Sequence, residues 1–434
     1  MPESNAPGVA QHVLVDHFFR HEYGRLVATL VRLFRTSQID IIEDAVQTAL
    51  AKALSAWARG GVPENPSAWL TSVAKNNVLD SIRRHRTADK GAESELSVRA
   101  QDAPEPTDPV LWGEIADDQL RMLFVCCEEG LNEQGRLVLA LKLLCGFATH
   151  EIAARLFISE DNVHKLLSRG RSHLKQAWSA REEWANTPKP ERLSSRLQSV
   201  QSVIYLLFNE GYSSLVHDAP IRRELCDEAI RLGQLLLQHP ATSTPESWAL
   251  MALMEMHVAR FASRHDGQGG LLMLEEQDRL AWDKAGIHRG LECLLHAAQG
   301  ENFSRYHAEA AVLAEHCIAP TFQQTRWDEI VSLYEMLEAR QPSPIHTLNR
   351  AIALAEWKGP QAGLDLLRQA KPPSWLSGYY LWDATHGELL RRQGAFEEAQ
   401  RYWLRAIESA PTKAERAVFE KKLARCADGD ASRG

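Results

Sequence analysis

Four cationic side chains lie close together on the second of two short predicted helices. The stretch "EIAARLFISEDNVHKLLSRGRSHLK", residues 151–175, contains Lys165, Arg169, Arg171 and Lys175. Cations on a helix make electrostatic contacts with phosphates, and Arg, Lys and Asn can also bond to base edges in the major groove. The polar residues predicted on the outer face of this helix are Asn162, His164, Lys165, Ser168, Arg169 and Arg171. The chemistry that the helix offers is binding of duplex DNA, although charged residues that only solvate the outer face of an amphipathic helix have the same pattern.

A second cationic cluster occurs earlier, in "KNNVLDSIRRHR". Helical spacing places Leu70, Val73, Ala74, Val78 and Ile82 on one side of this segment. The side left for solvent or a ligand carries Lys75, Asn76, Arg83, Arg84 and Arg86. Asp80 is expected to pair with Arg84 four residues on, which neutralises only one of these cations.

The whole chain is nevertheless acidic, with a net charge of −8 over 434 residues. Much of that acid lies between the two clusters, where residues 89–114 are rich in Asp, Glu and Pro. Such a segment cannot bury enough apolar surface to order itself, so we predict a flexible linker. The charge distribution therefore indicates two compact basic modules joined by an acidic tether, and the net charge argues against non-specific nucleic-acid binding.

Catalytic, metal and membrane chemistry is not indicated. The carboxylates of Glu275, Glu276 and Asp278 lie close together in the sequence, but no nucleophile or His pair accompanies them. Solvated or structural roles are therefore favoured over catalysis. The 17 His and 7 Cys are dispersed without metal-ligand spacing, which predicts no enzyme, no cofactor and no metal. The adjacent Cys126 and Cys127 are interpreted as small core residues. No apolar run approaches the roughly 20 residues of a membrane span and no signal pattern opens the chain, so a cytoplasmic protein is expected.

The residues of the two cationic clusters are expected to lie on helices, because helix-forming residues dominate the chain and alternating β-branched runs are absent. We predict an all-α fold. In the first segment, residues 11–88, Asp40 and Glu43 have capping-box spacing at the start of a helix. Its apolar stripe comprises Ile42, Ala45, Val46, Ala49, Leu50, Ala53, Leu54 and Trp57, and its opposite face comprises Glu43, Asp44, Gln47, Thr48 and Lys52. The loop "RGGVPENP" follows, and Asn65–Pro66 start the next helix.

The second segment, residues 115–180, ends in a predicted helix-turn-helix. Thr149 and Ser159 are the expected N-caps of its two helices. The first helix should pack through Ile152, Ala153 and Leu156 against Val163, Leu166 and Leu167 of the second, and Gly170 is unfavourable within a helix. Residues 188–340 form a predicted helical extension.

Residues 344–425 match the tetratricopeptide (TPR) pattern. The small, aromatic and helix-terminating positions of that pattern are occupied by Gly387, Gly394, Phe396, Ala399, Trp403, Ala406 and Pro411. Gly359 lies about one repeat length before Gly394, and a period near 34 residues is typical of this repeat. Such repeats commonly bind proteins, although a plain helical hairpin without a partner also fits.

The order of these segments resembles the extracytoplasmic-function class of bacterial sigma factors. The resemblance covers about residues 11–180 and is carried by "IEDAVQTALAKALSAW", "PSAWLTSVAKNNVLDSIRRHR" and "ATHEIAARLFISEDNVHKLLSRGRSHL", with the acidic linker between the last two. The remainder resembles the subgroup with a TPR-like C-terminal extension, through "LFNEGYS", "LEEQDRLAWD" and "LNRAIALAEWKGP".

The resemblance implies two partners, the RNA polymerase core and promoter DNA. Residues 11–88 would be sigma region 2, whose polymerase-binding face would be Glu43, Asp44, Gln47 and Thr48. Lys75, Asn76 and the preceding loop would hold the melted minus-ten strand, with Arg83, Arg84 and Arg86 on phosphates. Residues 115–180 would be sigma region 4, which binds the minus-thirty-five element. The chain departs from the family at Leu166, where a basic residue is usual, and Glu160 and Asp161 would repel a nearby phosphate.

Two other functions remain open at this point. One is a TPR-type interaction scaffold, which would not need the acidic–polar face of the first segment. The other is a free-standing helix-turn-helix regulator, which would bind duplex DNA without polymerase. Within the sigma interpretation, the C-terminal half is expected to regulate the modules in cis, by masking them or by organising them, and it offers a surface for a protein partner.

Overall fold

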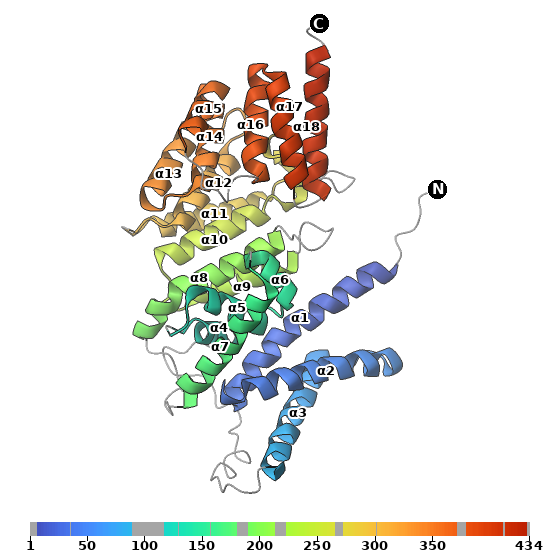
Figure 1. Ribbon diagram of the computed structural model, residues 1–434. Coiled ribbons are helices and arrows are strands. Elements are labelled where there is room, and N and C mark those ends of the chain that lie inside the picture. The colour runs from blue at the N-terminus through green and yellow to red at the C-terminus, as the bar shows by residue number, and fades with distance from the viewer. Residues whose placement is uncertain are drawn as a thin grey trace. The chain divides into compact units, whose positions relative to one another are not determined.

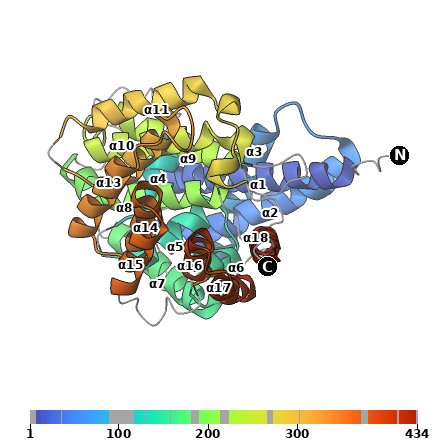
Figure 2. The same cartoon turned by 90° about the horizontal axis from the view of Figure 1, so that it is seen from above.

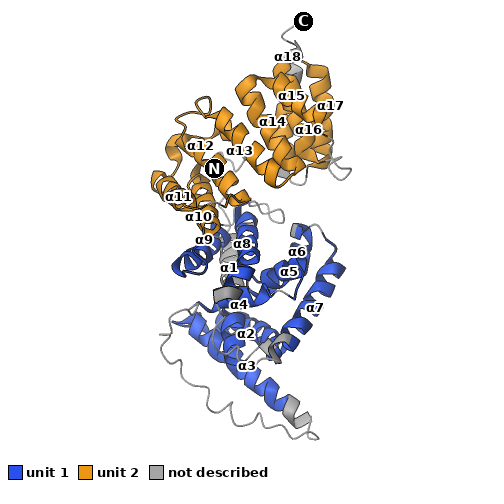
Figure 3. Ribbon diagram, turned by 90° about the vertical axis from the view of Figure 1, so that its left-hand side faces the viewer, with its two compact units in different colours: residues 1–243 blue, residues 244–434 orange. Residues whose placement is uncertain are grey.

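The computed structural model describes residues 7–34, 36–88, 117–128, 130–156, 158–179, 190–212, 223–264, 272–300, 302–370, 379–410 and 413–431. These residues form helices and turns with no strand among them, so the all-α prediction is confirmed (Figure 1). The predicted linker at residues 89–114 lies outside the described residues. The chain divides into two compact units, residues 1–243 and 244–434 (Figure 3). That boundary falls within the segment predicted as one helical extension, residues 188–340.

The first unit opens with three helices. They are α1 (Pro7–Phe34), α2 (Ile39–Gly60) and α3 (Pro66–Ala88), with a short 3-10 turn, η1 (Thr36–Gln38), before α2. Leu26, Val27 and Leu30 of α1 are fully buried. Because a fully buried aliphatic side chain contributes about 1.5–3 kcal/mol, such residues account for much of the packing. Hydrogen bonds also join the three helices. Ser67 of α3 donates to the buried Glu22 of α1 at 2.8 Å, and Asn77 of α3 donates to the carbonyl of Ala45 of α2 at 3.2 Å.

Six further helices complete this unit. They are α4 (Asp118–Cys126), α5 (Glu133–Leu143), α6 (Thr149–Leu156), α7 (Glu160–Ser179), α8 (Pro190–Tyr212) and α9 (Arg223–Gln238). Helix α8 packs on α4 and α5. Arg196 of α8 donates to Glu128 at 2.5 Å and to the carbonyl of Phe124 at 3.2 Å. Arg231 of α9 donates to Asp117, the N-cap of α4, at 2.8 Å. The first helices of the predicted extension therefore belong to the same compact unit as α4 and α5.

The adjacent thiols of Cys126 and Cys127 are fully buried at the end of α4. Burial raises the pKa of the Cys127 thiol to about 12 and raises that of Cys126 well above its ordinary value. Both side chains are therefore neutral and packed, as the sequence interpretation of small core residues predicted.

The second unit is a succession of helices, most of them packed on their neighbours in the chain. They are α10 (Pro245–Val258), α11 (Lys284–Ala297), α12 (Arg305–Ile318), α13 (Trp327–Arg340), α14 (Pro344–Lys358), α15 (Pro360–Gln369), α16 (Tyr380–Gln393), α17 (Phe396–Ser409) and α18 (Lys413–Ala431), with three 3-10 turns η4 (Phe261–Ser263), η5 (Leu274–Glu276) and η6 (Arg279–Ala281). Figure 2 shows α16, α17 and α18 nearly end-on, side by side.

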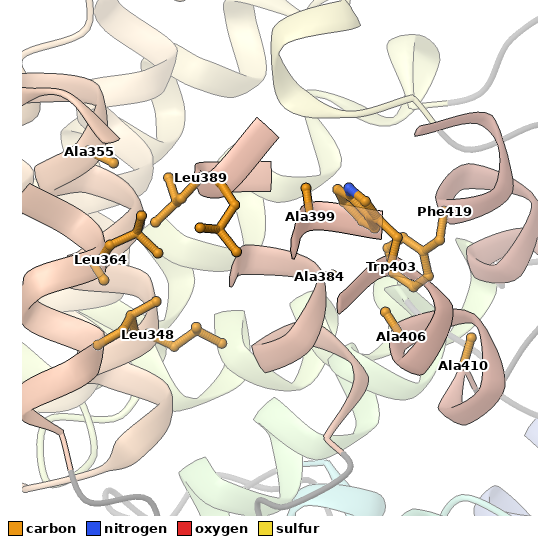
Figure 4. Packing of buried hydrophobic residues seen from close by; sticks show 13 residues of the cluster. Leu348, Ala355, Leu364, Ala384, Leu389, Ala399, Trp403, Ala406, Ala410 and Phe419 are labelled. Carbon is orange, nitrogen blue, oxygen red and sulfur yellow. The ribbon is translucent and has the colours of Figure 1, made fainter. Parts of the chain in front are cut away.

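The core of α14–α18 is centred on Trp403, which is 2% exposed (Figure 4). Gly387 of α16 faces it closely: a Cβ at this position would lie 3.0 Å from the indole ring. Gly394 ends α16 in the left-handed conformation, at a φ of 84°, which glycine adopts without strain. In the repeat pattern, Gly387 thus allows the Trp403 ring to pack closely against α16, and Gly394 allows α16 to end.

The carboxylates of "LEEQDRLAWD" have local structural roles. Glu276 accepts from the amide of Met273 at 3.0 Å, and Asp278 accepts from the amide of Leu280 at 2.9 Å, so both close 3-10 turns. Arg279 then donates to the terminal carbonyls of α12, at His316 and at Ala319. Arg279 thus ties η6 to the end of α12, and the carboxylates of Glu276 and Asp278 have the structural role that the sequence favoured.

Candidate polymerase and nucleic-acid interface

Asp44, Gln47 and Thr48 lie exposed on one face of α2, as the sequence predicts for the polymerase-binding surface. The expectation that Glu43 shares this exposure is wrong, because Glu43 is only 4% exposed. The predicted apolar stripe is also shorter than expected: Leu54 is 54% exposed, whereas Ile42, Val46 and Ala49 are fully buried. The first half of α2 therefore packs into the unit, while its second half projects an apolar side chain into solvent.

Glu43 is held by two polar partners. The Tyr23 hydroxyl of α1 donates to Glu43 Oε1 at 2.9 Å. Arg171 of α7 donates through Nε to Oε2 at 2.7 Å and through Nη2 to Oε1 at 3.0 Å. This two-point pairing of a guanidinium with a carboxylate is among the stronger hydrogen-bonded arrangements in proteins. Glu43 connects α1, α2 and α7.

The same contacts change the pKa of both partners. Burial raises the pKa of the Tyr23 hydroxyl above its ordinary value, and the charge of Glu43 raises it further. Burial by itself would lower the pKa of Arg171, but the hydrogen bonds and charge of Glu43 outweigh it and the pKa is raised. Tyr23 therefore remains a neutral donor and Arg171 a permanent cation at any physiological pH.

Asp40 does not cap α2. The helix begins at Ile39 after Gln38, and the Gln38 side chain makes no capping hydrogen bond. The predicted capping box is wrong because both of its acids bind elsewhere: Asp40 forms an ion pair with Lys175, and Glu43 binds Tyr23 and Arg171. A partner 135 residues away in the chain has displaced the local bond.

Lys75 and Asn76 are exposed on α3, in the positions predicted for contact with a single strand. Asn65 accepts from the amide of Ala68 at 3.0 Å, which confirms it as the N-cap before Pro66. The preceding loop contains Gly61 at a φ of 80° and leaves Val62 66% exposed. The loop thus exposes an apolar side chain and the helix after it exposes a cation and an amide, which are groups that can contact an unstacked base.

Arg83 and Arg84 are exposed in the last turns of α3. The expected pair of Asp80 with Arg84 is not the one that forms: the Asp80 carboxylate lies 3.6 Å from Arg83, and Arg84 donates instead to Ser81 at 3.1 Å. Exposed pairs of this kind contribute little, so both guanidinium groups stay accessible to phosphate. Arg86 lies within α3, and its side chain is outside the described residues.

Helices α6 and α7 are joined by a three-residue link and pack on each other. Ser159 accepts from the amide of Asn162 at 3.3 Å, as predicted for an N-cap. Thr149, by contrast, is the first residue of α6 and not its cap: Glu151 accepts from the amide of Ala148 at 2.7 Å and closes that helix start. Ile152, Ala153, Val163, Leu166 and Leu167 are all buried, so the apolar contact predicted between the two helices has the required residues.

Gly170 allows α7 to approach α5. A Cβ at this position would lie 2.6 Å from Leu139 Cδ1 and within 3.0 Å of two more atoms of that buried side chain. The glycine that was unfavourable by helix propensity is therefore explained by close packing.

The predicted DNA-reading residues of α7 fall into two groups. His164, Lys165, Ser168 and Arg169 are exposed and Asn162 is half-buried, all in the first half of the helix. Arg171 is wrongly placed on that outer face by the sequence, since its guanidinium binds Glu43 of α2. Leu166 is 8% exposed, so it is one of the buried apolar residues of α7.

Sequence reasoning missed Lys175 and Gly24 as residues that join the two modules, and it missed Tyr23 as a partner of Glu43 within the first one. Their partners lie between 20 and 135 residues away. Periodicity describes one helix at a time, so it gives no information about such pairs. Among the described residues no group of His, Cys, Asp or Glu has the geometry of a metal site. Within the same ranges, no helix is both long and apolar enough to cross a bilayer.

Comparison with known proteins places this geometry in a class. Residues 18–88, which cover α2, α3 and most of α1, match sigma-70 region 2, and residues 196–298 match a family of unknown function (DUF6596). No solved structure matches the chain significantly. The region 2 match supports a role as a sigma factor in transcription initiation, a class that binds core RNA polymerase and promoter DNA and is not enzymatic.

A full-length relative extends the comparison. The chain is 35% identical over 399 residues to the "Uncharacterized protein R00370" of Rhizobium meliloti (strain 1021), and the match covers 92% of each chain. At this identity and coverage the chain belongs to the same family as the Rhizobium protein.

Proposed function

We propose that the protein is an extracytoplasmic-function type of sigma factor that directs RNA polymerase to a particular set of promoters. The observation that carries this proposal is the coincidence of the region 2 match with α2 and α3, which expose an acidic–polar face on one helix and cations on the next. The protein would act in the cytoplasm, without a cofactor and without catalytic activity of its own.

Region 2 would use two surfaces. Asp44, Gln47 and Thr48 would bind the polymerase clamp directly, and Glu43 would join them only when Arg171 leaves it. Lys75 and Asn76 would hold the melted strand beside Val62, while Arg83, Arg84 and Arg86 contact its phosphates. Extracting a base from the stack costs a few kcal/mol, so these phosphate contacts are needed to offset it.

Helices α6 and α7 would form the helix-turn-helix of region 4. Residues Asn162, His164, Lys165, Ser168 and Arg169 would face the upstream promoter element, because they are the polar residues exposed in the first half of α7. A recognition helix commonly contacts base edges through its N-terminal residues, which is the half left open here.

The C-terminal half would regulate the sigma modules in cis. This proposal is supported by the contacts of α8 and α9 with α4 and α5, which join the start of the extension to the proposed region 4. Helices α14–α18 would be TPR-like and would bind a protein partner. Their exposed apolar residues Ile352, Trp357, Leu381 and Leu404 are suitable for such a contact.

The decisive experiment is run-off transcription with purified core polymerase and the DNA upstream of the protein's own gene. A sigma factor produces a discrete transcript that requires both proteins. A free-standing DNA-binding regulator would instead retard the same duplex without polymerase, and a scaffold would do neither.

A further inference from the structure

The second unit holds two arginine side chains against one tryptophan ring. Arg260, which follows α10, is only 7% exposed, and Arg279 of η6 is partly buried. Their guanidinium carbons lie 5.1 and 4.8 Å from the centroid of the Trp282 ring, which is fixed because its Nε1 donates to Ser263 at 2.6 Å. We call Arg260, Arg279 and Trp282, together with His316 of α12, the cation cluster.

Neither guanidinium group of the cation cluster pairs with a carboxylate among the residues that the structure describes. Arg260 donates to the side-chain oxygen of Gln277 at 3.1 Å. Arg279 donates to the carbonyls of His316 and Ala319 at the end of α12. These acceptors are dipoles without a net charge, so the hydrogen bonds leave both positive charges in place.

Carboxylates of the same segment serve other groups. Glu276 and Asp278 accept from backbone amides in their own 3-10 turns, and Asp283 caps α11. A helix end supplies only about half an elementary charge, so the ends of α10 and α12, even counted in full, leave about one positive charge unbalanced. A buried charge without a counter-ion is strongly unfavourable, which makes the cation cluster a place where an anion would be stabilised.

The cation cluster also has hydrogen-bonding capacity to spare. Within the described part of the chain, three of its buried nitrogen atoms have no hydrogen-bond partner: Arg260 Nε, Arg279 Nη2 and His316 Nδ1. A guanidinium N–H can only donate, so the two arginine atoms require an acceptor. Buried polar atoms in native proteins are nearly always bonded, and an acceptor that also carries negative charge would satisfy both requirements of this cluster.

The pKa values of neighbouring groups reflect the same positive field. Burial lowers the pKa of Arg279, and the charge of Arg260 lowers it further. Burial lowers the pKa of His257 well below its ordinary value, and Arg260 and Arg264 act in the same direction. Burial, with the charges of Arg260 and Arg279, brings the pKa of His316 to about 3. Both histidines are therefore neutral at pH 7, and the positive charge resides on the arginines.

The surroundings of Arg279 indicate the kind of anion. Leu280, the next residue, is 84% exposed, and Ile318, which lies between the two residues whose carbonyls accept from Arg279, is 55% exposed. Exposed apolar side chains beside a cation favour an anion that carries an aliphatic group. A carboxylate has one negative charge, which matches the charge left unbalanced, whereas a phosphate group has about 1.5 to 2 at pH 7.

We propose that the cation cluster is a binding site for the carboxylate of a small organic acid whose aliphatic part lies against Leu280 and Ile318. Arg260 and Arg279 donate to the carboxylate oxygens, and the ligand enters beside the exposed Leu280. Both arginines lie within residues 196–298, the segment that matches the family of unknown function. The inference concerns binding in the second unit alone, so it does not depend on the proposed function.

The test is isothermal titration calorimetry of the full-length protein with hexanoate, acetate and inorganic phosphate at pH 7. We expect wild type to bind hexanoate saturably. Acetate should bind at least about tenfold more weakly, because hexanoate has further methylene groups to bury. Phosphate should also bind more weakly than hexanoate, because its larger charge exceeds the charge that the cluster leaves unbalanced.

Four variants identify the residues that bind the ligand. Arg260→Gln and Arg279→Gln should each weaken hexanoate binding by about tenfold or more, the effect of losing a hydrogen bond to a charged group. Leu280→Ser should weaken the binding of hexanoate and leave that of acetate unchanged. Lys284→Gln removes an exposed positive charge from the start of α11 and is the matched control, which should bind as wild type does.

A second measurement locates the ligand on wild-type protein, where loss of folding plays no part. Histidine labelled with carbon-13 at Cε1 gives one NMR signal for each imidazole, and the signal absent from His316→Phe belongs to His316. Hexanoate should shift this signal with the half-saturation concentration found by calorimetry. The signal of His164, which is exposed on α7 of the first unit, should stay in place.

Absence of saturable hexanoate binding by wild type would overturn the site. Phosphate binding as tight as hexanoate binding would overturn the assignment to a carboxylate. A hexanoate complex that survives both arginine substitutions, or that leaves the His316 signal unshifted, would exclude the cation cluster as the place of binding. Circular dichroism checks the folding of each variant, and Leu280→Ser with the His316 signal keeps the test decisive if an arginine variant does not fold.

Discussion

Asp44 and Glu43 are adjacent residues of equal charge, yet they differ in what they can contact. Asp44 is exposed, whereas Glu43 is paired inside the unit with Tyr23 and Arg171. Polymerase therefore meets Asp44 first, and Glu43 becomes available only after a partner is removed. Single substitutions at the two positions should have different consequences.

Asp44→Arg should abolish co-purification with core polymerase while the protein stays folded. An exposed substitution away from buried groups changes stability by about 0.5 kcal/mol or less, so any loss of binding is local. The measurement is pull-down by core polymerase, with thermal unfolding as the check on folding. Glu398→Arg, an exposed reversal on α17, is the matched control. Wild-type recovery of the Asp44 variant would remove α2 from the polymerase contact.

Arg169→Ala and Lys165→Ala should both weaken binding of the upstream element, in ways that distinguish their roles. Loss of a base contact costs about 1–3 kcal/mol and relaxes specificity at one position, whereas loss of a phosphate contact lowers the salt slope by about one. Fluorescence anisotropy on wild-type and single-base-changed duplexes, at several salt concentrations, separates the two. Equal binding of all duplexes by both variants would exclude α7 as the reading helix.

Among the elements, α7 is defined by what it packs against. Gly170 faces Leu139 of α5, Arg171 faces α2, and the first turns face solvent. The helix is therefore held on two sides, so a substitution near its middle should change the free energy of unfolding of the first unit.

Gly170→Ala should destabilise the first unit, although alanine favours helix by about 1 kcal/mol over glycine. The added methyl overlaps Leu139, and overpacking in a buried site costs about 1–3 kcal/mol. Denaturant unfolding of the full chain measures the effect. Combining the change with Leu139→Ala should recover part of the loss through the space released. A simple gain in stability from Gly170→Ala would contradict the close approach of α5 and α7.

Helix α12 should make the second unit sensitive to acid. Burial, with the charges of Arg260 and Arg279, lowers the pKa of His316 to about 3 from 6.5. Because the unfolded chain takes up that proton first, stability is complete above pH 6.5 and falls as pH drops toward 3. At pH 5 the loss from this residue should reach up to about 2 kcal/mol. His316→Phe should remove that part of the slope, as measured by denaturant unfolding at pH 7 and pH 5; equal slopes would contradict the buried neutral form.

For the whole molecule, the important boundary lies after α9. Helices α8 and α9 belong to the first unit and are bonded to α4, whereas α10 to α18 form the second. An extension that organises the sigma modules would do so mainly through α8 and α9.

Two truncations separate these parts. Ending the chain after Ser243 should retain most run-off transcription, because the first unit is complete. Ending it after Pro188 should lower transcription several-fold, because it uncovers α4 and α5 and leaves Glu128 without Arg196. Circular dichroism on both proteins checks helix content. Higher activity in either truncated protein would show that the extension masks the modules instead of organising them.

The sequence was sufficient for the helical class and for several helix ends. Asn65 and Ser159 cap as predicted, because capping depends on residues three positions apart. The exposure of Asp44, Gln47 and Thr48 follows from periodicity in the same way. These features are local, and local physics determines them.

Glu43, Arg171 and Asp40 were misplaced for a different reason. A polar residue on a helix face has the same pattern whether it meets water or a partner of opposite charge. The partners here come from a helix more than a hundred residues away, so no spacing rule relates them. Gly170 and Gly24 are similar cases, since propensity counts the cost of glycine and cannot see the neighbour that requires it.

The paired thiols at the end of α4 have a practical consequence. Cys126 and Cys127 are buried, and their raised pKa values keep the nucleophilic thiolate almost absent at neutral pH. An alkylating reagent can reach them only when the end of α4 comes away from its neighbours. The rate at which these two cysteines are alkylated therefore reports how often the end of α4 opens. Mass spectrometry can follow that rate on the wild-type protein.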